Sequence, residues 1–317
     1  MKICIIGGSG FVGTHLIRKI KKNHEVIVID KRVNPEFVSS TIQLDIRDPE
    51  FSSVDLSGVD LIIHLAAEHR DDVTPVSLYY DVNVKGTKNI LDVMDKNDIS
   101  NIIFTSTVAI YGLNKSNPDE SFPAEPFNDY GKSKWKAEEV LYGWLKESPA
   151  NRKLSIVRPS VIFGEENRGN VYNLLKQVVS GRFLMIGNGE NKKSMAYVGN
   201  VVSFIEHLIE EKSTCEVYNY TDTPDLSTNQ LIEIIKKSLN IKIPPFRIPY
   251  YFGLFGGFVF DVIARFTRRK LPISAIRVRK FCADTQINAS KAHESGFTAP
   301  FSIHDGLGRT IKYEFDN

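Results

Sequence analysis

The chain has 317 residues with 42% hydrophobic and 25% charged residues, a globular composition long enough for a large core in one or two domains. Its formal net charge of +2 argues against nucleic acid as a partner, so any anionic ligand must be held by local cations or helix ends. The three cysteines lie far apart without CxxC spacing, which argues against a zinc site or a disulfide framework and fits a reducing cytosol.

The first half of the chain alternates short apolar runs with helical patterns. No secretory signal is expected, because only a short apolar run precedes the first glycines. Strands buried on both faces of a parallel sheet are predicted at 3–6, 26–29, 42–44, 61–65, 102–105 and 155–157, and helices at 12–21, 76–96 and 130–145. This alternation predicts an α/β fold with a Rossmann-type doubly wound parallel sheet, whose ligands bind beyond the carboxyl ends of the strands.

The pattern changes after residue 158, where glycine-containing loops alternate with helices. We expect a Rossmann domain over 1–165, with 193–214 packing back on it through a helix at 200–211. The segments 166–192 and 215–317 are expected to form a smaller α+β substrate-binding domain.

A glycine-rich turn follows the first predicted strand and opens the first helix. Gly7 allows the tight turn, Gly10 lets backbone N–H groups approach a pyrophosphate, and Gly13 permits close helix packing. Phe11 and Val12 lie between these glycines at the positive end of the helix. The strand before and the helix after give the motif the context that a dinucleotide-binding turn needs.

Acidic residues follow the second and third strands. Asp30 stands where a carboxylate accepts hydrogen bonds from both hydroxyls of an adenosine ribose and repels a 2′-phosphate. NAD is therefore favoured over NADP, although the cations of Lys31 and Arg32 leave NADP open. Asp45, with Ile46 beside it, is a candidate partner of the adenine amino group, and its alternative role is to cap a helix.

Tyr130 and Lys134 open a predicted helix four positions apart, so both project from one face. A tyrosine hydroxyl has a pKa of about 10, and a nearby ammonium lowers that pKa toward a useful range. Thr107 follows the preceding strand, where its hydroxyl can bond the reacting substrate oxygen. A lone YxxxK indicates only an amphipathic helix, but together the three residues predict proton transfer during oxidation of an alcohol.

These motifs resemble the extended short-chain dehydrogenase/reductase family, which includes nucleotide-sugar epimerases and dehydratases, over nearly the whole chain. Matching stretches are GGSGFVG, HLAA, DVNVKGT, YGKSK and the C-terminal NASKA. The resemblance implies NAD as cofactor, with Thr107, Tyr130 and Lys134 catalytic. It also implies that Leu65, Ala66 and Ala67 line the cofactor site, while His64 either lines it or packs at a strand end.

The chain departs from the family pattern in three places. Val108 and Ala109 follow Thr107 where dehydratases have Asp-Glu, which favours epimerisation or simple reduction over dehydration. Val161 stands where an asparagine often contacts the sugar phosphate, and Lys193 keeps a cation where the family has arginine.

Longer stretches resemble bacterial members of this family that act on N-acetylglucosamine linked through diphosphate to undecaprenol. They include LAAEHRDDVTPVSLYYDVNVKGT, RPSVIFGEENRGNVYNLLKQ and KSMAYVGN. The resemblance implies 4-epimerisation between lipid-linked GlcNAc and GalNAc in O-antigen or lipopolysaccharide assembly. Candidate substrate-binding residues are Thr107, Arg158, Asn170, Lys193 and Arg279. Alternatives are a 4-epimerase for UDP-GlcNAc or UDP-glucose, a 4-keto-sugar reductase using NAD(P)H, and a catalytically silent dinucleotide sensor.

Two further segments have open interpretations. In 249–270 aromatic residues precede a basic end, as in helices that lie in a membrane interface, whereas the alternative is a core helix with a solvated end. The charged cluster at 68–72 either approaches substrate or cofactor phosphates or forms a solvated loop. With the resemblance, we expect a cytoplasmic protein, peripheral on the inner face of the cell membrane, and a homodimer paired through 76–96 and 130–145.

Overall fold

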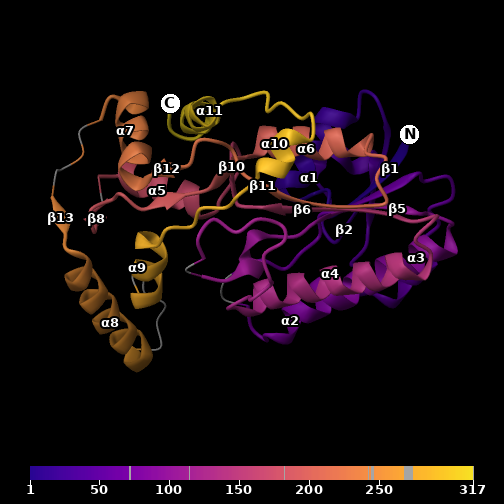
Figure 1. Ribbon diagram of the computed structural model, residues 1–317, viewed down its shortest axis with the longest axis horizontal. Helices are drawn as coiled ribbons and strands as arrows, with labels where there is room; N and C mark the ends of the chain where they lie inside the picture. Colours follow the sequence, from indigo (N-terminus) through magenta and orange to yellow (C-terminus); the bar gives the residue numbers. More distant parts are fainter. Residues whose placement is uncertain are drawn as a thin grey trace.

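The computed structural model describes residues 1–70, 73–113, 115–181, 183–241, 243, 246–267 and 274–316 (Figure 1). Its centre is a seven-stranded parallel sheet in the order β11-β6-β5-β4-β1-β2-β3. The strands are β1 (Lys2–Ile6), β2 (Glu25–Asp30), β3 (Thr41–Gln43), β4 (Leu61–His64), β5 (Asn101–Thr105), β6 (Lys153–Pro159) and β11 (Cys215–Tyr220). The predicted doubly wound sheet is confirmed, and its strand order reverses between β1 and β4, where such folds open a crevice for ligands.

Helices cover both faces of the sheet, which explains why its central strands are mostly apolar (Figure 1). One face carries α1 (Phe11–Ile20) and α6 (Val198–Ile209); the other carries α2 (Ser77–Tyr80), the π-helical turn η3 (Asp81–Lys85), α3 (Gly86–Lys96) and α4 (Asp129–Glu147). In β1, Ile3 and Ile5 join the core beneath α1 and α6, whereas Cys4 and Ile6 join the core beneath α3 and α4. The alternation follows from the two-residue period of a strand.

Strand β11 corrects the expected domain boundary at residue 215. It pairs with β6 from Cys215 opposite Leu154 to Tyr220 opposite Pro159, and it therefore completes the Rossmann sheet. The sequence CEVYNY mixes polar and apolar residues because β11 is an edge strand, so it lacks the continuous apolar run that marks its neighbours. The other expected domain boundaries stay a prediction.

The remaining elements gather mainly at one end of the sheet (Figure 1). They are α5 (Asn170–Val179), α7 (Thr228–Leu239), α8 (Tyr250–Thr267), α9 (Ala275–Cys282), α10 (Ser290–Glu294), α11 (Ile303–Phe315), β7 (Val161–Phe163), β8 (Met185–Ile186), β9 (Lys192–Lys193), β10 (Met195–Tyr197), β12 (Leu226–Ser227) and β13 (Arg247–Ile248). Short 3-10 helices are η1 (Pro35–Ser40), η2 (Pro49–Ser53) and η4 (Val108–Tyr111). Among the described residues, no helix combines the length and the apolar character needed to cross a membrane.

Candidate active site

The glycine turn after β1 is built for close backbone approach. Gly7 has φ +87°, and a Cβ there would lie 2.5 Å from the backbone nitrogen of Ala66, which follows β4. A Cβ on Gly13 would lie 2.6 Å from Cα of Gly8. No side chain caps α1 at Gly10, and its first turn has no acidic residue, so its N-terminal amides are available to an anion. This arrangement fits the pyrophosphate of a dinucleotide.

Asp30 is held at the edge of the same turn. Its Oδ2 accepts a hydrogen bond from the Ser9 backbone N–H at 3.0 Å, and its Oδ1 accepts one from the Arg32 N–H at 3.0 Å. Asp45 is bound by Arg47, whose Nε and Nη2 donate to its two carboxylate oxygens at 2.9 and 2.7 Å. Both carboxylates are thus oriented by the chain, and their contacts with a nucleotide stay predictions.

We expect replacement of Asp30 by serine to shift cofactor preference toward NADP. The change removes the charge that repels a 2′-phosphate and leaves the cations of Lys31 and Arg32 in place. Binding of NAD⁺ and NADP⁺ should be compared by calorimetry in both proteins. An unchanged ratio of the two affinities would show that Asp30 does not read the ribose.

The other expected cofactor residues lie around the turn, partly in the core. Phe11 packs its ring against His15 at a centroid distance of 5.3 Å. Val12, Leu65 and Ala66 pack against the core clusters, and Ala67 is half-buried. Ile46 is fully inside the core, close to Gly86 of α3. His64 is buried against Phe104 and bonds Thr87, which favours the strand-end packing role.

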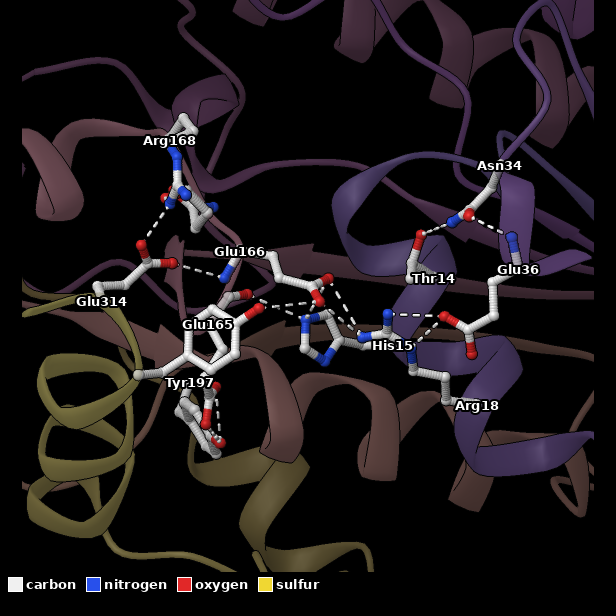
Figure 2. Close-up of polar contacts among 12 residues, drawn as sticks. Thr14, His15, Arg18, Asn34, Glu36, Glu165, Glu166, Arg168, Tyr197 and Glu314 are labelled. Atoms are coloured by element: carbon white, nitrogen blue, oxygen red, sulfur yellow. Dashed lines mark hydrogen bonds and ion pairs between the residues drawn. The ribbon is translucent and has the colours of Figure 1, made fainter. Parts of the chain in front are cut away.

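A polar network joins α1 to the loop after β7 (Figure 2). His15 Nε2 lies 3.1 Å from the carbonyl oxygen of Glu165, and Arg18 donates to both Glu36 and Glu166. Such half-exposed pairs contribute little stability individually. Their effect is positional, because they hold the loop of residues 164–169 against α1.

The catalytic candidates meet where β5 ends and α4 begins. Thr107 caps η4 by accepting a hydrogen bond from the Ala109 N–H at 3.1 Å. The Thr107 hydroxyl also acts on the Tyr130 phenol, because it lowers the pKa of that group. Asn128 caps α4 by accepting from the Gly131 N–H at 2.8 Å. A Cβ on Gly131 would lie 2.7 Å from the Ala109 carbonyl oxygen, so glycine lets α4 approach η4 closely.

Burial controls the titration of this site. It raises the pKa of Tyr130 to about 12, although the hydrogen bond from Thr107 opposes the rise. Burial also lowers the pKa of Lys134 to about 7, against the opposing charge of Glu138. The Lys134 ammonium lies 3.9 Å from the centroid of the Phe104 ring. In the protein alone, burial therefore disfavours charge on both groups, and added positive charge would favour the phenolate.

The lowered pKa of Lys134 predicts how the stability of the cofactor-free protein depends on pH. Between about pH 7 and pH 9 the unfolded chain binds more protons at Lys134 than the folded chain, so the free energy of unfolding should rise with pH. Above that window the raised pKa values of Cys4 and Tyr130 oppose the trend. Urea titrations should show this rise in the wild type and a flatter dependence in Lys134→Met; equal slopes would contradict the assignment.

Asn83 fixes the position of α4, a role that its sequence motif alone does not reveal. Its side-chain amide donates to the Glu68 carbonyl at 3.0 Å and to Ser133 Oγ at 2.8 Å, while its oxygen accepts from the Glu68 N–H. Ser133 in turn donates to the Tyr130 carbonyl oxygen at 2.8 Å. Asn83 lies in η3, a π-helical turn that interrupts the predicted 76–96 helix, and such turns occur often at functional sites.

Arg158 is not placed to bind a diphosphate, contrary to the sequence prediction. Its Nε and Nη2 donate to the two carboxylate oxygens of Glu138 at 3.1 and 2.6 Å, and its Nη1 donates to the Tyr111 hydroxyl at 2.8 Å. Arg158 and Glu138 are both buried, and Glu138 lies one turn after Lys134 on α4. Nothing in the sequence pattern singles out Glu138, because a lone glutamate on a helix normally faces solvent.

The other expected substrate residues lie apart from one another. The Lys193 ammonium donates to the carbonyl oxygens of Lys280 and Ala283, so it caps the end of α9 and has one N–H left for a ligand. Arg279 is exposed on α9, and Asn170 is exposed at the first position of α5. Their contacts with substrate stay predictions.

The charged cluster at 68–72 is described only to Arg70, and Asp71 and Asp72 lie outside the described residues. Buried Glu68 accepts both side-chain hydrogen bonds of exposed Arg70, which holds the pKa of Glu68 at about 2. Within the part of the chain that the structure describes, no group of His, Cys, Asp and Glu side chains is arranged to hold a metal ion.

The fold and the site define a class of protein, the dinucleotide-dependent enzymes that move a hydride and a proton at a carbon–oxygen bond. Residues 3–220 match the model of the NAD dependent epimerase/dehydratase family. The chain belongs to this family, and NAD is its cofactor.

Known proteins resemble the chain over most of its length. It is 53% identical, over 99% of its length and 95% of the other protein's, to the N-acetyl-alpha-D-glucosaminyl-diphospho-ditrans,octacis-undecaprenol 4-epimerase of Escherichia coli O157:H7. It is 31% identical, over 76% of its length and 83% of the other's, to a putative UDP-glucose 4-epimerase of Methanocaldococcus jannaschii. The UDP-glucuronic acid 4-epimerase of Bacillus cereus in complex with NAD has the same fold, with a TM-score of 0.78, 20% identity, and coverage of 99% of this chain and 98% of that one.

Proposed function

We propose that this protein is a 4-epimerase that interconverts N-acetylglucosamine and N-acetylgalactosamine carried through diphosphate on undecaprenol, in O-antigen or related polysaccharide assembly. One observation carries the proposal: the 53% identity to the enzyme named for this reaction extends over 99% of the chain. The similarity thus includes the segments outside the Rossmann sheet, where a substrate would be recognised.

The proposed mechanism uses three side chains at the edge of the sheet. Tyr130 as phenolate accepts the proton of the sugar 4-hydroxyl and later returns it, while Thr107 hydrogen-bonds the same oxygen. Lys134 adds positive charge that favours the phenolate. NAD⁺, when bound to the glycine turn, supplies the oxidation and reduction at sugar carbon 4. Val108 and Ala109 follow Thr107 and begin η4, so these positions offer no carboxylate to remove water from the sugar.

The diphosphate of the substrate needs cations other than Arg158, whose donors are used inside the protein. The remaining N–H of Lys193 and the exposed guanidinium of Arg279 support a diphosphate site beside α9. With this function we expect a cytoplasmic protein at the inner face of the cell membrane. We expect it to form a homodimer that pairs through residues 76–96 (α2, η3 and α3) and 130–145 (in α4). Analytical ultracentrifugation tests the pairing, because a monomer at all concentrations would exclude it.

The experiment that tests the function compares carriers of the same sugar. Purified protein should epimerise N-acetylglucosamine on undecaprenyl diphosphate in the presence of membranes and turn over UDP-N-acetylglucosamine much more slowly. Stoichiometric NAD released on denaturation would separate an epimerase with resident cofactor from a reductase using exchangeable NADPH. Efficient turnover of the nucleotide-linked sugar alone would identify a UDP-sugar 4-epimerase instead.

A further inference from the structure

Helix α8 exposes a continuous apolar face. Tyr251 and Phe266, near its two ends, are 81% and 84% exposed. The exposed large apolar residues between them include Phe252, Phe255, Phe258, Val259, Val262 and Ile263. Their spacing of three and four places them on one side of the helix. Soluble monomers rarely leave so large an apolar patch in water, so we expect a binding partner to cover this side of α8.

The opposite side of α8 is packed, which sets the direction of the exposed face. A Cβ on Gly253 would lie 2.5 Å from Ile186 of β8, and one on Gly257 would lie 2.8 Å from the backbone nitrogen of Ala275 in α9. Asp261 Oδ2 accepts a hydrogen bond from the same Ala275 N–H at 3.0 Å. Figure 1 shows α8 and α9 side by side at one end of the molecule, with α8 on the outside.

The charge around this face matches an anionic surface. Residues 246–282 contain eight basic residues and one acidic residue, a net charge of +7, whereas the whole chain carries +2. The single acidic residue, Asp261, is turned toward α9. Arg265, Arg277 and Arg279 are exposed, while the basic end at 268–270 lies outside the described residues. An aromatic face on a segment so rich in basic residues suits anionic headgroups better than a mixed-charge protein surface.

Helix α9 connects this surface to the catalytic helix. The Lys280 ammonium of α9 lies 5.5 Å from the centroid of the Phe127 ring. Phe127 directly precedes Asn128, the cap of α4, and Tyr130 lies in the first turn of that helix. The end of α9 is also held by the Lys193 ammonium. The helix pair therefore spans from the exposed apolar face to the beginning of the active-site helix.

We propose that the aromatic face of α8 docks on an anionic membrane surface and that α9 bridges this surface to the start of α4. A sugar carried on a membrane-anchored diphosphate then reaches Tyr130 while its lipid stays in the bilayer. The docking stands independently of the reaction, but this consequence for the substrate rests on the proposed function.

The test uses the full-length protein with Phe255→Asp and Phe258→Asp combined. The matched control is Val38→Asp, which changes another exposed apolar residue, in η1. Co-sedimentation is measured with vesicles of phosphatidylcholine alone and of phosphatidylcholine with phosphatidylglycerol. Wild type and control should bind the anionic vesicles preferentially, and the double variant should bind about tenfold more weakly or less, because the inserted phenyl groups are lost.

Turnover separates docking from the proposed function. Epimerisation is measured on undecaprenyl-linked sugar in the same vesicles and on a water-soluble short-chain diphosphate analogue. The double variant should lose activity on the vesicle substrate and keep the wild-type rate on the soluble one. Vesicle binding without turnover of either substrate would refute the proposed function and leave docking standing.

Other outcomes overturn the docking. Vesicle binding or vesicle turnover by the double variant at wild-type levels would show that α8 is not the docking element. A wild type that ignores vesicles but changes from dimer to monomer in the double variant, by ultracentrifugation, would make this face a contact between two copies of the chain.

Discussion

Replacing Tyr130 by phenylalanine should reduce turnover by about 100- to 10,000-fold, the range that positioned acid–base catalysts contribute. Thr107 lowers the pKa of the Tyr130 phenol. Positive charge from the Lys134 ammonium and from a bound cationic cofactor would lower it further. Phenylalanine fills the same volume, so the fold and NAD retention should persist. Both are measured, by unfolding and by release of the cofactor on denaturation.

The control for this variant is Tyr313→Phe, which removes a hydroxyl from an exposed tyrosine on α11. It should keep wild-type activity. If Tyr130→Phe also kept turnover, the proton acceptor would have to be another group, and the proposed mechanism would be wrong. If it lost both activity and NAD, Tyr130 would act in cofactor binding before chemistry.

Replacing Arg158 by leucine should lower the free energy of unfolding by about 3–5 kcal/mol, because it leaves the buried carboxylate of Glu138 without its partner. The loss should be measured by urea unfolding. The double variant Glu138→Met with Arg158→Met removes both charges and should recover most of the stability.

The single and double variants also distinguish between two roles for Arg158. A diphosphate ligand on the surface would raise KM when replaced and leave stability nearly unchanged. If Arg158 is instead a buried partner of Glu138, its replacement should lower the stability and leave KM nearly unchanged. The double variant should then lower the pKa of Lys134 further, because Glu138 opposes the effect of burial on that pKa. A rise in KM at wild-type stability would restore the diphosphate role.

The sequence was most informative where a local pattern and a backbone requirement coincide. The apolar runs of β1, β2, β4, β5 and β6 and the glycine turn predict the Rossmann sheet and its ligand edge, because burial on both faces requires apolar strands. The spacing of Tyr130 and Lys134 places them on one side of α4, because a helix turns every 3.6 residues. Strand β11 was not predicted, because it is a partly exposed edge strand and therefore tolerates polar residues.

Only the tertiary structure decided which polar residues are consumed inside the protein. No sequence motif contains both Arg158 and Glu138. They meet because β6 lies beneath α4. Lys193 caps α9 across some ninety positions of sequence, and Asn83 joins α4 through a π-helical turn that periodicity does not reveal. Partners of this kind depend on how elements pack, and packing is a property of the whole chain.

For the segment 249–270, too, the sequence determined one property and the tertiary structure another. By itself the sequence predicts an apolar helix with a basic end and leaves its surroundings open, because an apolar helix suits either a core or an interface. The structure settles which side is covered, since Gly253 and Gly257 let β8 and α9 approach closely and leave the aromatic side in the open. Length, composition and motifs determined the family and its chemistry, whereas the exposed face of α8 emerged only once the neighbours of each residue were known.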